Sequence, residues 1–422
     1  MKILVIGSGG REHAITWKLS QSSSQPELYC SPGNAGIARI AKCVAARVED
    51  VRELADLASS LHADLTFVGP EIPLVAGIAD EFSSRGLRLV GPSAAAARLE
   101  GSKIFSKEFM ARHRIPTARF TVCASPAAAV DAFEHRYNLP VVVKADGLAA
   151  GKGVRIAATR AEFDLAIKEM MVDRVFGQSG DRVLLEECLA GREASLMLFT
   201  DGRDFKVMAP ARDYKRVDDG DIGPNTGGMG SYSTSGIIDE PTLAAIRNKI
   251  IEPTLAGMAA EGAPFAGILY AGLMLTADGP MVIEFNARFG DPETQTILPR
   301  LDSDLVSICD SIVDENIGAA NVDWSKRSSV CVVAASGGYP GAFEKGKVIS
   351  GLTEAGNLEN VTVFHAGTST NEGGDIVTSG GRVLGITATG NTLQQARSRA
   401  YAAVGHITFD AMHFRTDIAA VP

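Results

Sequence analysis

The sequence lacks the features that mark secreted, membrane and nucleic-acid-binding proteins. Its 6 cysteines lie far apart, with no C-x-x-C pair and no histidine at zinc-finger spacing, so we expect reduced, buried thiols. No apolar run approaches the ~18 residues that span a membrane, and the N-terminal run is too short for a signal peptide. A formal charge of −9 disfavours nucleic-acid and anionic-membrane partners. We therefore expect a cytoplasmic protein.

The composition fits a globular chain with several domains. At 422 residues and 45% hydrophobic content it can bury large cores, and the usual ~100–200 residues per domain predict two to four domains.

The first hundred residues alternate strand and helix patterns. The predicted strands span 2–7, 27–31, 64–70 and 87–93, and helical patterns start at Arg11, cover 51–63 and follow Pro73. Such alternation predicts a parallel sheet with helices on both faces and ligands beyond the carboxyl ends of the strands.

Two further units follow. The second has predicted strands at 140–146 and 182–187 and a hairpin over 267–285 that turns at Asp278-Gly279. After a helical stretch at 303–316, the third unit has predicted strands at 330–336, 361–367 and 382–389 and a helix from Thr392.

The stretch "IEFNARFGDPET" ends a predicted strand with Glu284, Asn286 and Arg288 spaced two apart. Side chains at that spacing project from one face of a strand. A carboxylate and an amide oxygen suit Mg²⁺ or Mn²⁺, and a guanidinium recognises carboxylate or phosphate. The pattern indicates phosphate chemistry, although a polar sheet edge is the alternative.

The stretch "VIGSGGREH" predicts a strand, a turn and a helix start, where Gly9 and Gly10 could bind phosphate. It does not match a dinucleotide fingerprint, because the third glycine position holds Glu12 and no acid closes the second strand. A tight structural turn is the alternative. We expect His13 to pack or hydrogen-bond at the helix start rather than to bind a metal.

A second glycine-rich loop follows the strand that delivers Lys144. It contains Gly147, Gly151, Lys152 and Gly153, which could fold over phosphates. The spacing is not that of a P-loop, and a hairpin loop with an exposed lysine is the alternative.

Two polar segments come after it. Glu186, Glu187 and Glu193 could accept hydrogen bonds from an adenine amino group and ribose hydroxyls, or could be surface glutamates beside a turn. The segment 211–232, with Asp213 and Lys215, predicts a long structureless loop that encloses substrate.

Taken in order, Lys103, Lys144, "GLAAGKG", "EECLAGRE" and "EFNARFGDPETQ" resemble the motifs of ATP-grasp ligases. Within that superfamily, the sequence resembles the glycinamide ribonucleotide synthetase (phosphoribosylamine–glycine ligase) family. The motifs that carry this similarity are "GSGGREHA", "PGNAG", "VGPEIPLV", "EGSK", "GPNTGGMG" and "AASGGYPG", and it runs from Lys2 into the 400s.

The resemblance implies an α/β protein with an N-terminal Rossmann-like parallel-sheet domain, central ATP-grasp domains and a small C-terminal α/β domain. The implied domains are 1–101, which binds phosphoribosylamine, 102–326, with an ATP lid at about 120–190, and 327–422. The implied reaction joins glycine to 5-phospho-β-D-ribosylamine through glycyl phosphate, using ATP and Mg²⁺ or Mn²⁺. With it we expect a monomer that acts on these small molecules.

The resemblance also implies roles for individual residues. ATP contacts fall to Lys103, Lys144, Gly151, Lys152, Gly153, Glu186, Glu187, Leu189 and Glu193. Substrate contacts fall to Gly9, Gly10, Glu12, Glu71, Asp213, Lys215, Arg288 and Asp291. Catalytic roles fall to Arg288, Lys144 and Asp213, and metal ligation to Glu284 and Asn286.

One departure concerns the metal site. Many ATP-grasp enzymes carry a further metal-binding acid about a dozen residues before the glutamate, where this sequence has Ala271 and Gly272. We expect phosphate oxygens and water to complete the site, rather than Asp291 or Glu293.

Three alternatives stay open. Another ATP-grasp ligase of purine metabolism would share the ATP residues but not "GPNTGGMG" together with "VGPEIPLV". An NAD(P)-dependent oxidoreductase built on the first unit is disfavoured by Glu12, and a regulatory protein that has lost its chemistry is disfavoured by the intact set of polar residues.

Overall fold

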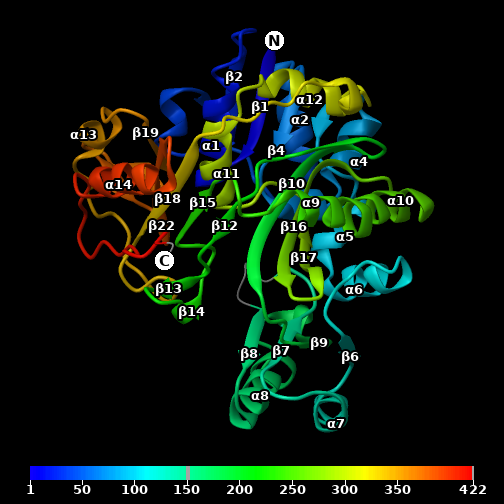
Figure 1. The fold of residues 1–422 in the computed structure, drawn as a ribbon. Helices are drawn as coiled ribbons and strands as arrows, with labels where there is room; N and C mark the ends of the chain where they lie inside the picture. Colours follow the sequence, from blue (N-terminus) through cyan, green and yellow to red (C-terminus); the bar gives the residue numbers. More distant parts are fainter. Residues whose placement is uncertain (149–152, 421–422) are drawn as a thin grey trace.

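The computed structural model describes residues 1–148 and 153–420 and shows four lobes built on separate sheets (Figure 1). No helix within the described residues is long and apolar enough to cross a membrane.

The N-terminal lobe is a five-stranded sheet in the order β3-β2-β1-β4-β5. Every pairing in it is parallel, as predicted. Its strands are β1 (Lys2–Gly7), β2 (Glu27–Pro32), β3 (Lys42–Cys43), β4 (Leu65–Val68) and β5 (Leu89–Val90). Its helices are α1 (Gly10–Leu19), η1 (Ile37–Arg39), α2 (Val51–Leu61), α3 (Glu71–Val75), α4 (Ile78–Ser84) and α5 (Ala94–Gly101).

The helix predicted after Pro73 is present as α4, and a short helix that was not predicted, α3, precedes it. Helix α3 begins at Glu71 and contains Pro73 in its first turn. A proline is tolerated there because its missing N–H would have had no partner within the helix.

A small lobe hangs below the rest of the molecule in Figure 1, and its sheet has the order β6-β9-β7-β8. After α6 (Lys103–Arg112) it comprises β6 (Phe120–Cys123), α7 (Pro126–Arg136), β7 (Val141–Ala145), β8 (Val154–Ala157), α8 (Arg160–Ile167), η2 (Lys168–Val172), η3 (Gly177–Gly180) and β9 (Val183–Glu187). Its buried side chains, such as Phe133 and Phe163, form a cluster of their own. A lobe with a separate core can move as a unit.

The central sheet has the order β11-β10-β16-β17. Its strands are β10 (Arg192–Asp201), β11 (Phe205–Val207), β16 (Ala266–Thr276) and β17 (Gly279–Asn286), and the last two form the predicted hairpin. Nearby helices are α9 (Glu240–Ile246), η4 (Arg247–Ile251), α10 (Glu252–Ala260), α11 (Glu293–Ile297), η5 (Leu298–Arg300), α12 (Leu305–Val313) and η6 (Ile317–Ala319). Leu198 and Phe285 share one core with Leu4 and Ile6 of β1, so these two lobes pack as one body.

The C-terminal sheet has the order β12-β15-β18-β22-β19. It contains β18 (Ser328–Ala335), β19 (Val361–His365) and β22 (Arg382–Gly390), together with β12 (Arg212–Asp213) and β15 (Gly230–Ser233) from much earlier in the chain. The remaining elements are the hairpins β13 (Arg216–Asp218)–β14 (Ile222–Asn225) and β20 (Thr368–Thr370)–β21 (Ile376–Thr378), with α13 (Leu352–Gly356) and α14 (Leu393–Val404).

The prediction of a structureless loop over 211–232 is therefore wrong. Tyr232 pairs with Val330 of β18, and Arg216 pairs with Asn225 across a hairpin. Because these strands are only two to four residues long, they are too short to show the alternation of apolar and polar residues from which a strand could be predicted.

Candidate active site

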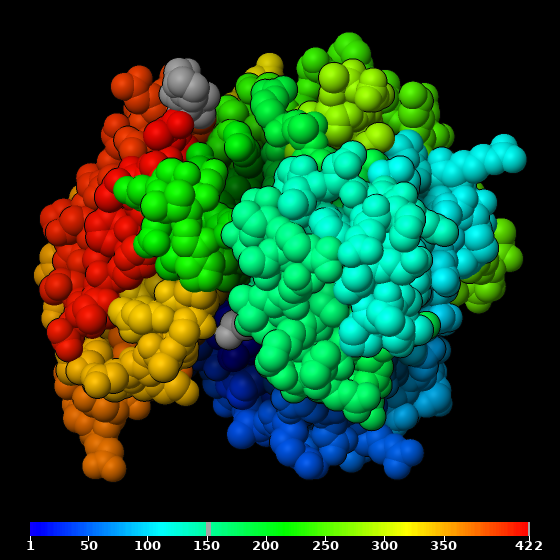
Figure 2. All heavy atoms as spheres, turned by 90° about the horizontal axis from the view of Figure 1, so that it is seen from below, coloured from blue at the N-terminus to red at the C-terminus, as the bar shows by residue number. Residues whose placement is uncertain are grey.

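A cavity of about 690 Å³ opens where the small lobe, the central sheet and the C-terminal lobe meet. Seen from below, the small lobe lies beside the segment around 215–225 and the C-terminal lobe, with a furrow between them (Figure 2). The predicted site residues that line the cavity are Glu71, Lys103, Lys144, Gly153, Glu186, Glu187, Leu189, Glu193, Asp213, Lys215, Glu284, Asn286, Arg288 and Asp291.

Other predicted residues do not line this cavity within the described part of the chain. The Glu12 carboxylate accepts from the Gly9 N–H at 2.6 Å and pairs with Arg11 at 2.6 Å, so it caps the start of α1. Gly10 is buried as the first residue of that helix. Gly151 and Lys152 lie outside the residues that the structure describes.

Glu284 and Asn286 lie at the end of β17, and Arg288 follows just beyond the strand. The pairing with β16 shifts by one residue near Gly272, which lies opposite Glu284. A Cβ on Gly272 would lie 3.3 Å from Cγ of Glu284, so the neighbouring strand has little room for a side chain beside this glutamate. No group of three or more His, Cys, Asp or Glu side chains is gathered for a metal ion among the described residues.

The Glu284 carboxylate lies in a positive surrounding. Burial opposes its ionisation, but Lys215, Lys144 and Lys103 together hold its pKa below the ordinary value. Burial lowers the pKa of Lys103, and the charge of Glu284 opposes that change. Lys103 also donates to the carbonyl of Gly147 at 2.7 Å and so holds the start of the glycine-rich loop.

Arg288 is held by two carboxylates. Its Nη2 lies 2.8 Å from Oε1 of Glu100, and its Nε lies 3.4 Å from Oε2 of Glu71. Burial opposes the charge of Arg288, but Glu100 and Glu71 raise its pKa. The guanidinium is therefore a fixed cation at the cavity wall, suited to an anionic carboxylate or phosphate.

Glu186 is clamped between two lysines. Nζ of Lys107 and Nζ of Lys144 each lie 2.9 Å from a Glu186 carboxylate oxygen. Burial lowers the pKa of Lys107 to about 8, although Glu186 opposes the change. The predicted set omitted Lys107, yet it stands four residues after Lys103 in α6, the spacing at which helical side chains share a face.

Asp213, Lys215 and Glu193 form a charged cluster in the cavity wall. Burial raises the pKa of Asp213 to about 7, and the neighbouring Lys215 limits the rise. Lys215 also pairs with Glu193 at 3.3 Å. Asp213 is thus a carboxyl group able to take up a proton near neutral pH.

Glu293 is one of the two acids that could serve as a further metal ligand. Its Oε1 accepts from the hydroxyls of Ser195 and Tyr270, each at 2.9 Å. One oxygen of this carboxylate therefore has partners within the protein, and the completion of the metal site by ligand oxygens stays a prediction.

Comparison with known proteins identifies the chain's family. A model of the N domain of phosphoribosylglycinamide synthetase matches residues 1–100, its ATP-grasp (A) domain matches 101–294 and its C domain matches 329–421. The chain belongs to the phosphoribosylglycinamide synthetase family. It is an ATP-grasp protein, as the sequence motifs indicated.

Named relatives of this family cover the full chain. The phosphoribosylamine–glycine ligase of Vibrio vulnificus (strain YJ016) is 49% identical over 421 residues, covering 99% of this chain and 97% of the relative. The ligase of Caldanaerobacter subterraneus subsp. tengcongensis is also 49% identical, over 420 residues and 100% of both chains.

Solved structures agree with the fold. The crystal structure of phosphoribosylamine–glycine ligase from Thermotoga maritima has a TM-score of 0.85 and 34% sequence identity, covering 99% of this chain and 100% of that chain. A biotin carboxylase from Campylobacter jejuni has a TM-score of 0.73 at 14% identity, covering 98% and 92%, which is a likeness of fold alone.

Within this member of the synthetase family, the structure adds cavity residues beyond the predicted set: Arg11, Glu100, Lys107, Tyr270 and Arg382. Glu100 lies in the motif "EGSK", which pointed to this stretch of the sequence but did not indicate the role of the glutamate. Arg382 follows two glycines in the C-terminal lobe, and no motif marks it.

His13 packs and hydrogen-bonds as predicted. Its Nδ1 accepts from the backbone N–H of His365 at 2.7 Å, and its ring meets Phe364 edge to face. The histidine therefore joins α1 of the synthetase's N-terminal lobe to β19 of its C-terminal lobe.

Proposed function

We propose that this protein joins glycine to 5-phospho-β-D-ribosylamine with ATP, giving glycinamide ribonucleotide, ADP and phosphate, a step of purine biosynthesis. The family and its named relatives support the overall reaction. The observation that carries the site assignment is the meeting of Glu284 and Asn286 with Lys103, Lys144 and Arg288 in one cavity.

The chemistry explains why cations line the cavity. A carboxylate is a poor acyl donor because its leaving group would be an oxide, and phosphorylation by ATP supplies a better one. Transfer of the γ-phosphoryl group to glycine spreads negative charge over its oxygens. Fixed cations placed beforehand stabilise that charge without reorganising.

We assign the nucleotide to the side of the cavity next to the small lobe. Lys103 and Lys144 would contact the phosphates, and the loop that ends at Gly153 would close over them. The carboxylate of Glu186 would accept from the adenine amino group, Leu189 would offer backbone contacts, and Glu193 would accept from ribose. The separate core of this lobe supports a lid that closes on ATP.

Glu284 and Asn286 fit a divalent metal. An ionised carboxylate and an amide oxygen are hard donors of the kind that Mg²⁺ or Mn²⁺ prefers. The remaining positions would go to phosphate oxygens and water, because Mg²⁺ commonly keeps several waters. Such an ion, when bound, would offset the charge of the transferring phosphoryl group.

Glycine and phosphoribosylamine would bind at the cavity wall that holds Arg288 and Asp213. Arg288 would hold the glycine carboxylate and then the acyl phosphate, because its planar fork matches two oxygens. Asp213 would accept the proton that the attacking amine loses, since its pKa lies near neutrality. Glu71, Lys215 and Asp291 would contact phosphoribosylamine.

We propose that Gly9, Gly10 and Glu12 shape the turn that meets the sugar phosphate. Residues 1–101, 102–326 and 327–422 are proposed as the domains, the lid as about 120–190, and the protein as a cytoplasmic monomer.

The test is ADP release with Mg²⁺ and ATP, adding glycine and phosphoribosylamine made in situ from ribose 5-phosphate and ammonia. ADP should form rapidly only when both are present. ADP formed without either, or with bicarbonate or formate in place of glycine, would overturn the substrate assignment and favour another ATP-grasp ligase.

A further inference from the structure

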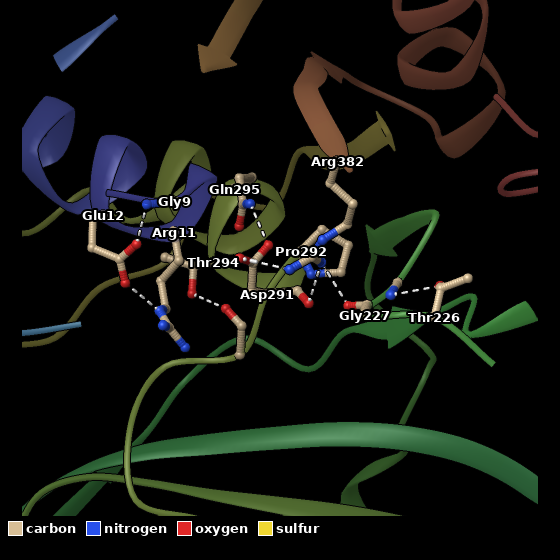
Figure 3. A network of polar contacts seen from close by, with 12 residues as sticks. Gly9, Arg11, Glu12, Thr226, Gly227, Asp291, Pro292, Thr294, Gln295 and Arg382 are labelled. Atoms are coloured by element: carbon tan, nitrogen blue, oxygen red, sulfur yellow. Dashed lines mark hydrogen bonds and ion pairs between the residues drawn. The ribbon is translucent and has the colours of Figure 1, made fainter. Parts of the chain in front are cut away.

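Arg382, at the start of β22, brings the C-terminal lobe to the cavity wall. Its Nη1 donates to the carbonyl of Gly227 at 2.6 Å and to that of Asp291 at 3.0 Å. Its Nη2 lies 3.1 Å from Oδ2 of Asp291 (Figure 3). A guanidinium with these donors engaged by protein oxygens is suited to hold its neighbours in place.

The Asp291 carboxylate is oriented from several sides. Its Oδ1 accepts from Nε2 of Gln295 at 2.7 Å, while Arg382 holds the other oxygen. A Cβ on Gly9 would lie 3.6 Å from that second oxygen, so the carboxylate also faces the turn before α1. Asp291 therefore sits where the N-terminal, central and C-terminal lobes meet (Figure 3).

The segment Gly227–Gly228 packs closely against Arg382 and Pro292. A Cβ on Gly227 would lie 2.9 Å from Cζ of Arg382, and a Cβ on Gly228 would lie 2.4 Å from Cδ of Pro292. The N–H of Gly227 donates to the Tyr339 hydroxyl at 2.9 Å. Only glycines allow this segment to approach the guanidinium and the turn at Asp291 so closely.

Charge supports an ionised Asp291. Burial opposes ionisation, but Arg382 and Arg11 together hold the pKa of Asp291 below its ordinary value, with help from the Gln295 hydrogen bond and from Arg288. Loss of Arg382 would raise that pKa, so the carboxylate would become protonated at a higher pH.

We propose that Arg382 is a positioning residue for the ribonucleotide side of the reaction. It fixes the Asp291 carboxylate to accept hydrogen bonds from the sugar or amine of phosphoribosylamine and of its product. The inference rests on the proposed function and deepens it. The proposed role affects binding of the ribonucleotide and not of ATP. Among the described residues, Lys144 and Glu186, which are assigned to the nucleotide, form no hydrogen bond or ion pair with Arg382 or Asp291.

The experiment compares Arg382→Met with Arg397→Met. Arg397 lies in the same lobe and also donates to backbone carbonyls, those of Ile418 and Thr416, but is not among the described residues that line the cavity. Calorimetry should show glycinamide ribonucleotide bound at least ~10-fold more weakly by Arg382→Met, the scale of losing a charged hydrogen bond, with ADP within about 2-fold. Arg397→Met should leave both affinities within about 2-fold.

Two further measurements distinguish a positioning role of Arg382 from a general loss of structure. Ribonucleotide affinity of Arg382→Met should be lost on acidification at a higher pH than in the wild type. The effects of Arg382→Met and Asp291→Asn should not add in the double variant, because both remove the same contact. Should Arg382→Met fail to fold, Arg382→Lys keeps the charge without the fork and takes its place, with the same expected loss of ribonucleotide affinity.

Equal weakening of ADP and ribonucleotide, unchanged ribonucleotide affinity, or full additivity with Asp291→Asn would overturn the role of Arg382. A wild-type protein that neither binds glycinamide ribonucleotide nor releases ADP with both substrates would instead overturn the proposed function. The wild-type measurement therefore distinguishes the two failures.

Discussion

Arg288, which is partly buried, forms an ion pair with the buried Glu100, with Nη2 of the arginine 2.8 Å from Oε1 of the glutamate. The second oxygen of Glu100 accepts from the Ala287 N–H at 2.6 Å, so one carboxylate holds both the guanidinium and the backbone beside it. Burial raises the pKa of Glu100, and the charge of Arg288 opposes the rise. Each side chain thus depends on the other for its charge and its orientation.

Replacement of Arg288 by lysine tests the glycine assignment. We expect Arg288→Lys to raise the KM for glycine at least ~10-fold, because an ammonium cannot reproduce the bidentate fork. The KM for ATP should change little. Steady-state kinetics with Arg397→Lys as the control measures both values, and an unchanged glycine dependence would refute the role.

Removal of Glu284 tests the metal assignment. We expect Glu284→Ala to lower turnover by well over ~10²-fold, the scale on which losing one preorganised electrostatic contact is felt. The matched control is Glu261→Ala, because Glu261 pairs with Arg112 on the surface. Near-normal turnover of Glu284→Ala at saturating Mg²⁺ would contradict the assignment.

The pH dependence of amine use tests Asp213. Because burial raises the pKa of this carboxyl to about 7, it is mostly neutral below that pH and becomes a proton acceptor above it. We expect kcat/KM for phosphoribosylamine to rise through pH ~7 in the wild type and Asp213→Asn to lose that rise. A profile from pH 6 to 9 decides the matter, with Asp278→Asn in the exposed hairpin turn as the control. The same inflection in Asp213→Asn would rule out this residue as its source.

The pair of histidines between the lobes predicts sensitivity to acid. Burial lowers the pKa of His13 from 6.5 to about 3 and that of His365 to about 4. The unfolded chain therefore binds more protons between pH 6.5 and 4, and stability is lost as the pH falls through that window. We expect the wild-type Tm to drop more steeply there than the Tm of His13→Asn, whose amide can still accept from His365.

Thermal unfolding at pH 7 and pH 5 measures this difference, which we expect to be on the order of ~2 °C. His135→Asn is the control, because His135 is exposed on α7 and should leave the pH dependence unchanged. Equal slopes for His13→Asn and the wild type would show that His13 does not cause the acid sensitivity.

Local pattern was enough to predict much of the fold. The alternating strands and helices of the first unit and the hairpin at 267–285 follow from short-range periodicity and turn residues, and the structure confirms both. The sequence analysis did not predict helix α7, although Ser125 caps it and Pro126 follows. Its buried face consists of Ala129, Ala132 and Phe133, and small alanines make only a weak apolar pattern.

The sequence by itself determined the family and the polar residues available for catalysis, because each motif is a continuous stretch that can be recognised without knowing where it lies in the fold. Only the tertiary structure decided how those residues meet. Strands β12 and β15 join a sheet made mainly from residues after 328, and Arg382 reaches Asp291 across lobes. Such contacts join segments far apart in the chain, and the pKa values of Asp213 and Glu100 arise from burial, which packing alone sets.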